Sequence, residues 1–184
     1  MLTGLAAAYF VTAAVGIVAP ASAETIARGR IWLLLTSALA AQGPMPLAQV
    51  ALTAAVAGLV VGRLGARAWW RAAFVGHVGS ALIAYALIAF AGAERAAATP
   101  DYGVSCVLGA SFGALLTVNG RVRVLGIAGT LALLPLSSGW IGLEHPLAVV
   151  LGAAVTARAR AAARSPRPAR KATRRPAGPR RPGR

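Results

Sequence analysis

Apolar residues are grouped into long runs along this chain, and short loops that carry most of the charged residues separate the runs. Each run has close to the ~20 residues that an α-helix needs to cross a bilayer. The pattern therefore predicts six membrane-spanning helices, at residues 3–20, 45–62, 72–92, 103–118, 122–138 and 145–158.

Composition agrees with this pattern. Hydrophobic residues make up 58% of the 184 positions and charged residues 12%, and the mean hydropathy is +0.69. These values exclude a water-soluble domain and predict an all-α membrane protein. The lone cysteine, Cys106, excludes an intramolecular disulfide and argues against a thiolate metal site, so we expect no metal.

The net charge of +15 is concentrated at one end, because 11 of the 19 basic residues fall within positions 158–184. That stretch is rich in proline, has no acidic residue and is predicted to be disordered. We expect a membrane domain at 1–158 and a basic cytoplasmic tail at 159–184. We expect the tail to bind anionic lipid head groups. Each basic residue near the membrane surface would contribute about 1 kcal/mol to the free energy of binding. The tail has no aromatic side chain for base stacking, so no specific nucleic-acid binding is expected.

The loops predict an orientation. With the N-terminus in the cytoplasm, most loop arginines and the basic tail lie inside, which is the positive-inside pattern. Both ends are then cytoplasmic. Trp32 and Trp140 would mark the outer interface, and Trp69 and Trp70 the inner one. An alternative for the first segment is a cleaved signal peptide, since residues 21–23 resemble a cleavage site.

Ser105 and His145 are the candidate chemical groups. Each lies at the outer end of its predicted span, so the two share one membrane level. The fourth span is short, ~24 Å against a ~30 Å hydrocarbon core, and the chain before it should descend into a water-filled cavity. Each of the two residues lies at the start of a helix face that small residues line at helical spacing, and such faces permit close packing of two helices. The small residues are Gly109 and Gly113 after Ser105, and Ala148 and Gly152 after His145.

A serine beside a histidine can act as a nucleophile activated by a base. A serine between spans also commonly bonds a backbone carbonyl, and small-residue faces occur in most helical bundles, so packing is the alternative for each feature alone. A histidine in a membrane is costly and usually functional. His77 is predicted to be a packing histidine on the inner side, far from Ser105.

Five short motifs appear in an order that resembles the rhomboid family, the six-helix intramembrane serine proteases, and in particular a bacterial rhomboid-like branch. The resemblance covers the chain up to its tail. The motifs are WLLLTSAL at 32–39, Leu64-Gly65 followed by Arg67 and Trp69, GHVG at 76–79, DYGVSC at 101–106, and the HxxGxxxG-like stretch at 145–152.

The resemblance implies an intramembrane serine endopeptidase that cleaves transmembrane proteins in a bacterial-type plasma membrane. Ser105 would be the nucleophile and His145 the general base, without a third member and without a cofactor. Gly103 and Gln49 would support the oxyanion site.

The family has histidine and asparagine as oxyanion donors, and Gln49 stands in the asparagine position. Three further departures bear on activity, because the family has glycine after the nucleophile, histidine as the other oxyanion donor and glycine before the catalytic histidine. Those positions hold Cys106, Met45 and Glu144. They favour the alternative of an inactive rhomboid-like protein that binds transmembrane helices. A small transporter is a weaker alternative, because no ionisable residue is predicted near the bilayer midplane.

Overall fold

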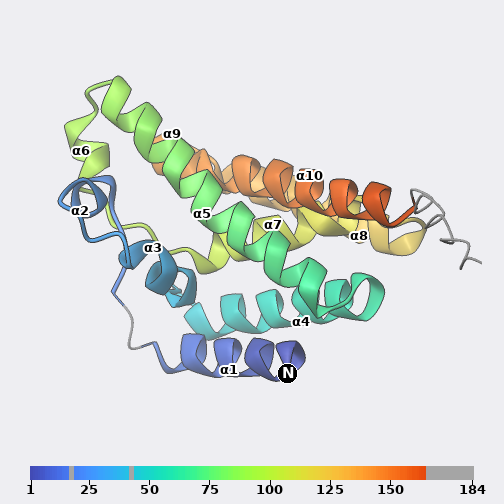
Figure 1. The fold of residues 1–184 in the computed structure, drawn as a ribbon. Helices are drawn as coiled ribbons and strands as arrows, with labels where there is room; N and C mark the ends of the chain where they lie inside the picture. The colour runs from blue at the N-terminus through green and yellow to red at the C-terminus, as the bar shows by residue number, and fades with distance from the viewer. Residues whose placement is uncertain (17–18, 42–43, 165–184) are drawn as a thin grey trace, which may run out of the picture.

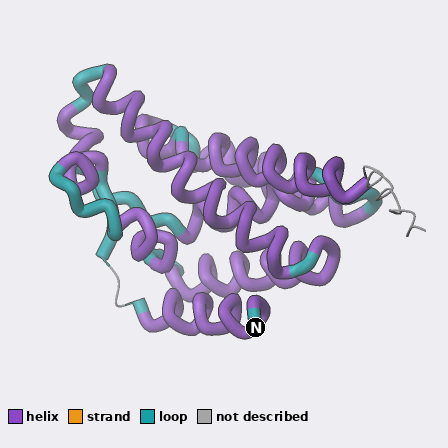
Figure 2. The backbone as a smooth tube through the Cα atoms, in the orientation of Figure 1, coloured by secondary structure: helices purple, strands orange, loops and turns teal. Residues whose placement is uncertain are grey.

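A computed structural model of the chain describes residues 1–16, 19–41 and 44–164, and within these ranges it is built from helices without a β-strand. The predicted all-α class is confirmed. Figure 2 shows how little of the backbone lies in loops. In the described ranges the longest helices run back and forth through the bundle (Figure 1), and they are α1 (Leu2–Val15), α4 (Pro46–Leu64), α5 (Ala66–Phe90), α7 (Val104–Leu116), α8 (Arg121–Leu133) and α10 (Glu144–Arg164).

Shorter helical turns join these helices. At one end of the bundle α2 packs against α3 and α6 (Figure 1). At the other end Gly65 makes the tight turn between α4 and α5, with a φ of 85° that favours glycine. The short elements are α2 (Ala23–Ala27), α3 (Leu33–Thr36), η1 (Ser37–Leu39), α6 (Glu94–Ala97), η2 (Leu134–Leu136) and α9 (Gly139–Gly142).

Three segments are long and apolar enough to cross a membrane, which indicates a membrane protein: Pro46–Leu64, Ala66–Phe90 and Gly139–Ala163. The other three predicted spans correspond to α1, α7 and α8, with 14, 13 and 13 residues. At 1.5 Å per residue these helices are only ~20 Å long, against a ~30 Å hydrocarbon core. Six helical segments are therefore present in the predicted order, but only three have the length of a span.

The short helix α7 is the centre of the bundle. Eleven of its 13 residues are buried. Helices α10, α5, α8 and α4 all pack against it. A helix surrounded by protein has little contact with lipid, so it does not need to match the thickness of the bilayer.

Aromatic residues join α1 to this core. Tyr9 packs edge-on against Trp69 and Trp70, and the Trp70 indole N–H donates to the Leu2 carbonyl at 3.1 Å. Trp69, which was predicted to mark the inner membrane interface, is fully buried, and its indole N–H donates to Ser111 Oγ at 3.1 Å. Its side chain therefore packs inside the bundle and does not face lipid.

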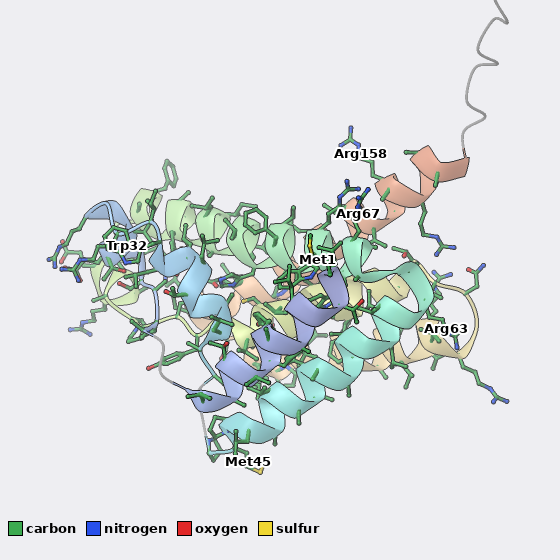
Figure 3. All side chains as sticks on the ribbon, turned by 60° about the horizontal axis from the view of Figure 1, so that its bottom comes forward. Met1, Trp32, Met45, Arg63, Arg67 and Arg158 are labelled. Atoms are coloured by element: carbon green, nitrogen blue, oxygen red, sulfur yellow. The ribbon has the colours of Figure 1, made fainter. Side chains whose placement is uncertain are left out.

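The two ends of the bundle differ in side-chain character. Arg63, Arg67 and Arg158 lie toward one end, and Trp32 lies at the opposite end (Figure 3). Trp32 is 57% exposed, as expected of a residue at a membrane interface.

Helix α10 continues past the predicted end of the membrane domain at residue 158. It runs to Arg164, and the Arg160 guanidinium donates to the carbonyl of Thr117 at the end of α7. Residues 159–164 are thus part of the helix and not of a disordered tail. The remainder of the predicted tail, residues 165–184, lies outside the described residues.

Candidate functional site

The backbone before α7 is held inside the bundle by hydrogen bonds. Asp101 forms a two-way antiparallel bridge with Ala21, with N–O distances of 2.8 and 3.2 Å. The N–H of Gly103 donates to the Ser37 carbonyl at 2.8 Å. These bonds pair backbone N–H and C=O groups of a buried, irregular segment, as an environment with little water requires. They also pair the N–H of Gly103, a residue predicted to support the oxyanion site, with the Ser37 carbonyl.

His77 lies against the start of α7, so its predicted position far from Ser105 was wrong. A Cβ at Gly103 would overlap the His77 ring. The ring is buried, and its Nε2 lies 2.7 Å from the Leu34 carbonyl oxygen and 3.2 Å from Ser37 Oγ. His77 is near the middle of the long helix α5, and the short helix α7 begins at that depth, so the two residues meet.

Helices α7 and α10 pack closely along their small residues. A Cβ at Gly113 would overlap the Val149 carbonyl oxygen, and one at Gly152 would overlap the Ala110 carbonyl oxygen. In both cases the obstacle is backbone, which cannot move aside as a flexible side chain can. The small residues therefore allow the two helices to approach more closely than larger side chains would.

The same packing extends to the level of the candidate dyad. A Cβ at Gly109 would lie 3.3 Å from the carbonyl oxygen of His145 and 3.6 Å from the Cβ of Ala148. Ser105 is one turn before Gly109 on α7. Pro146 lies in the first turn of α10, where its missing N–H costs nothing. The first turns of α7 and α10 are thus brought side by side.

Ser105, His145 and Gln49 line one cavity of about 310 Å³ between these first turns. The cavity brings together the predicted nucleophile, the predicted base and one predicted oxyanion residue. Its complete lining is Gln49, Pro100, Asp101, Tyr102, Ser105, Cys106, Leu136, Ile141, Glu144 and His145.

Ser105 Oγ donates to the Tyr102 carbonyl at 3.2 Å. The imidazole of His145 lies close to the carbonyls of Leu136 and Gly142, yet its buried Nδ1 has no hydrogen-bond partner in bonding geometry. The serine and the histidine therefore share a cavity while each faces a different neighbour. No hydrogen bond joins the Ser105 hydroxyl to the imidazole among the described residues.

Gln49 Oε1 is also buried without a hydrogen-bond partner. Its carboxamide carries two N–H groups that can donate to an oxygen in the cavity. The first N–H groups of a helix have no partner within the helix, so the amides of Ser105 and Cys106 add donors at the same place. The cavity can thus combine a hydroxyl, an imidazole and several N–H donors.

A second group of polar side chains in this cavity was not predicted from the sequence. Asp101, Cys106 and Glu144 are buried, and one ligand atom from each lies within 4.8 Å of the others. Cys106 Sγ donates to Glu144 Oε2 at 3.6 Å, and the Tyr85 hydroxyl donates to Asp101 Oδ2 at 2.9 Å. One signal was present in the sequence: Glu144 directly precedes His145 and points about 100° around the helix from it.

No family model matches the chain, and no curated protein or solved structure matches it.

Proposed function

We propose that this chain is an intramembrane serine endopeptidase of the rhomboid type, with Ser105 as nucleophile and His145 as general base. One observation carries the proposal: the two residues come from different helices and line one polar cavity inside an apolar bundle. A buried hydrolase needs a cavity of this kind to admit water.

The reaction would proceed in two steps. Ser105 Oγ attacks the carbonyl carbon of a peptide bond in a locally unwound transmembrane segment, while His145 takes the hydroxyl proton and passes it to the leaving amine. Water then cleaves the acyl-enzyme ester, with His145 again as base. The Gln49 carboxamide and the first N–H groups of α7 would donate to the oxyanion.

The arrangement of Ser105 is compatible with this chemistry. Its hydroxyl is bonded to a carbonyl of the preceding turn, which is a common position for a serine in a helix. Catalytic hydrogen bonds are often long or misaligned without substrate and tighten when it binds. Rotation about one side-chain bond changes the direction of the hydroxyl within the cavity.

A second candidate is a protein that binds transmembrane helices without cleaving them. Two observations favour it. Within the described part of the chain no hydrogen bond joins Ser105 to His145, and the buried Cys106 that follows the serine donates to Glu144.

Labelling with a fluorophosphonate probe separates the two candidates, because the probe reacts with an activated serine. We expect the detergent-purified chain to be labelled, and Ser105→Ala and His145→Ala each to reduce labelling at least a hundredfold. Ser138→Ala is the matched control, since Ser138 is exposed and does not line the cavity; it should be labelled like the parent.

Size-exclusion chromatography would show that each variant is folded. A folded parent chain that takes no label would overturn the peptidase proposal and favour the binding protein. Equal labelling of the parent and Ser105→Ala would show that another residue reacts.

A further inference from the structure

We propose that Asp101, Cys106 and Glu144 form a binding site for one divalent transition-metal ion, Zn²⁺ by preference. This inference goes beyond the proposed peptidase and does not depend on it. The three side chains come from the segment before α7, from α7 itself and from the first residue of α10. All three are buried, and their ligand atoms lie within 4.8 Å of one another.

The separation of two of these atoms fits a tetrahedral zinc site. Zn–S bonds of ~2.3 Å and Zn–O bonds of ~2.1 Å at a tetrahedral angle place sulfur and oxygen ~3.6 Å apart. Cys106 Sγ and Glu144 Oε2 are 3.6 Å apart. A ligand atom of the Asp101 carboxylate lies within 4.8 Å of both, and in a bound site it would stand about 3.4–3.6 Å from each.

A second observation points independently to a ligand. Glu144 Oε1 is buried without a hydrogen-bond partner, on a side chain that is only 1% exposed. Burying a carboxylate oxygen with no donor is costly. A cation in the cavity would supply the missing partner.

The charge balance supports the same conclusion. Asp101 and Glu144 are two buried acidic residues in one cluster, and the only ion pair among the described residues joins Arg28 to Glu24 elsewhere. Two carboxylates in a low-dielectric bundle need a counter-charge or protons. A divalent ion would balance the charge of the two carboxylates, and the Cys106 thiolate would leave one net negative charge at the site.

Tyr85 acts as a positioning residue in this site. Its hydroxyl donates to Asp101 Oδ2 at 2.9 Å and so fixes the orientation of the carboxylate. Outer hydrogen bonds of this kind typically hold metal ligands in place.

The donor set selects the metal. A thiolate favours Zn²⁺ over Mg²⁺ and Ca²⁺, which prefer oxygen ligands alone. Zinc requires the deprotonated thiolate, so binding would release the Cys106 proton to water in the cavity. Three protein ligands leave a fourth position for a water molecule, and the cavity that Ser105 and His145 also line provides the space.

Metal content tests the site directly. The full chain, purified in detergent without an affinity tag, would be dialysed against Zn²⁺ and analysed by plasma mass spectrometry. We expect one zinc per chain. Cys106→Ser and Glu144→Gln should each reduce zinc affinity at least a hundredfold, and Tyr85→Phe about tenfold to a hundredfold.

Two controls separate this site from other binding and from the dyad. Glu94→Gln removes an exposed acidic residue of α6 and should leave zinc content unchanged. Ser105→Ala should also keep its zinc, although the peptidase proposal expects it to lose probe labelling. Failure of one proposal is therefore distinguishable from failure of the other.

Cobalt substitution tests cysteine ligation without any variant. Bound Co²⁺ should give a thiolate-to-metal charge-transfer absorption that Cys106→Ser abolishes. A folded chain without stoichiometric zinc and without this absorption would overturn the proposal, and the two carboxyl groups would then be kept neutral by protons. Zinc binding that persists unchanged in Cys106→Ser would overturn it as well.

Discussion

Gly103 lies where the ring of His77 reaches the first turn of α7. Its φ of −76° and ψ of −8° are accessible to any residue, so backbone conformation does not require glycine here. The requirement is space. The contact joins α5 to the segment that positions Ser105, and it gives His77 a structural role in the site.

We predict that Gly103→Ala lowers the free energy of unfolding by about 1–3 kcal/mol, the usual cost of an overpacked core. The new methyl group would displace the His77 ring and weaken its hydrogen bond to the Leu34 carbonyl. Thermal unfolding in detergent measures the effect. Gly58→Ala is the control, because a Cβ there meets nothing within 4 Å. Alanine favours a helix interior over glycine by up to about 1 kcal/mol, so the control midpoint should stay the same or rise. Equal midpoints for both variants would contradict the steric argument.

Some of the site could be predicted at the level of residues. Ser105 and His145 line one cavity, and helical spacing with span order was enough to expect them at one level. The contact of His77 with Gly103 was missed, since it depends on the depth at which the short helix α7 begins. The cluster of Asp101, Cys106 and Glu144 was missed because Asp101 and Glu144 precede different predicted spans and meet only when α7 and α10 pack together.

At the scale of elements, the glycines of α7 and α10 determine how closely these two helices pack. Gly113 faces the Val149 carbonyl, and Gly152 faces the Ala110 carbonyl. Close contact of this type is the main source of association between helices in membranes, where lipid is as apolar as leucine.

Gly113→Ala should therefore separate α7 from α10 and reduce probe labelling at Ser105 as well as stability. We expect a loss of about 1–3 kcal/mol in the free energy of unfolding, because the new Cβ meets backbone that cannot rotate away. Gly62→Ala on α4 is the matched control, with nothing within 4 Å of its new Cβ. Thermal unfolding and labelling would be measured on the same samples. Wild-type behaviour of Gly113→Ala would show that the interface tolerates a wider separation.

The sequence predicted the order of the helices better than their lengths. Hydropathy marks every apolar segment but does not tell whether lipid or protein surrounds it. Helix α7 is apolar because it is buried in the bundle, and its 13 residues are too few to span the bilayer alone. Hydropathy also could not reveal that Trp69 is buried, since its hydrogen-bond partner Ser111 comes from a distant segment of the chain.

At the scale of the whole molecule, the asymmetry between the two ends predicts how the chain lies in the membrane. Arginines gather at the end where α4 turns into α5, and Trp32 lies at the opposite end (Figure 3). Positive residues favour the cytoplasmic side and tryptophans favour either interface. We therefore predict that the arginine-rich end faces the cytoplasm and that the cavity lies toward the outer side.

Single cysteines in a Cys106→Ala background test this orientation in intact cells. The two positions are Ala98, which lies beside α6 at the cavity end, and Asn119, which lies in the turn between α7 and α8 at the other end. Both residues are exposed, and neither Ala98→Cys nor Asn119→Cys alters the charge. A membrane-impermeant maleimide should label position 98 and not position 119, whereas both should react after the cells are lysed. The reverse pattern would place the cavity on the cytoplasmic side. Any substrate would then be cut at its cytoplasmic boundary, and the polybasic tail would lie away from the anionic lipids of the inner leaflet.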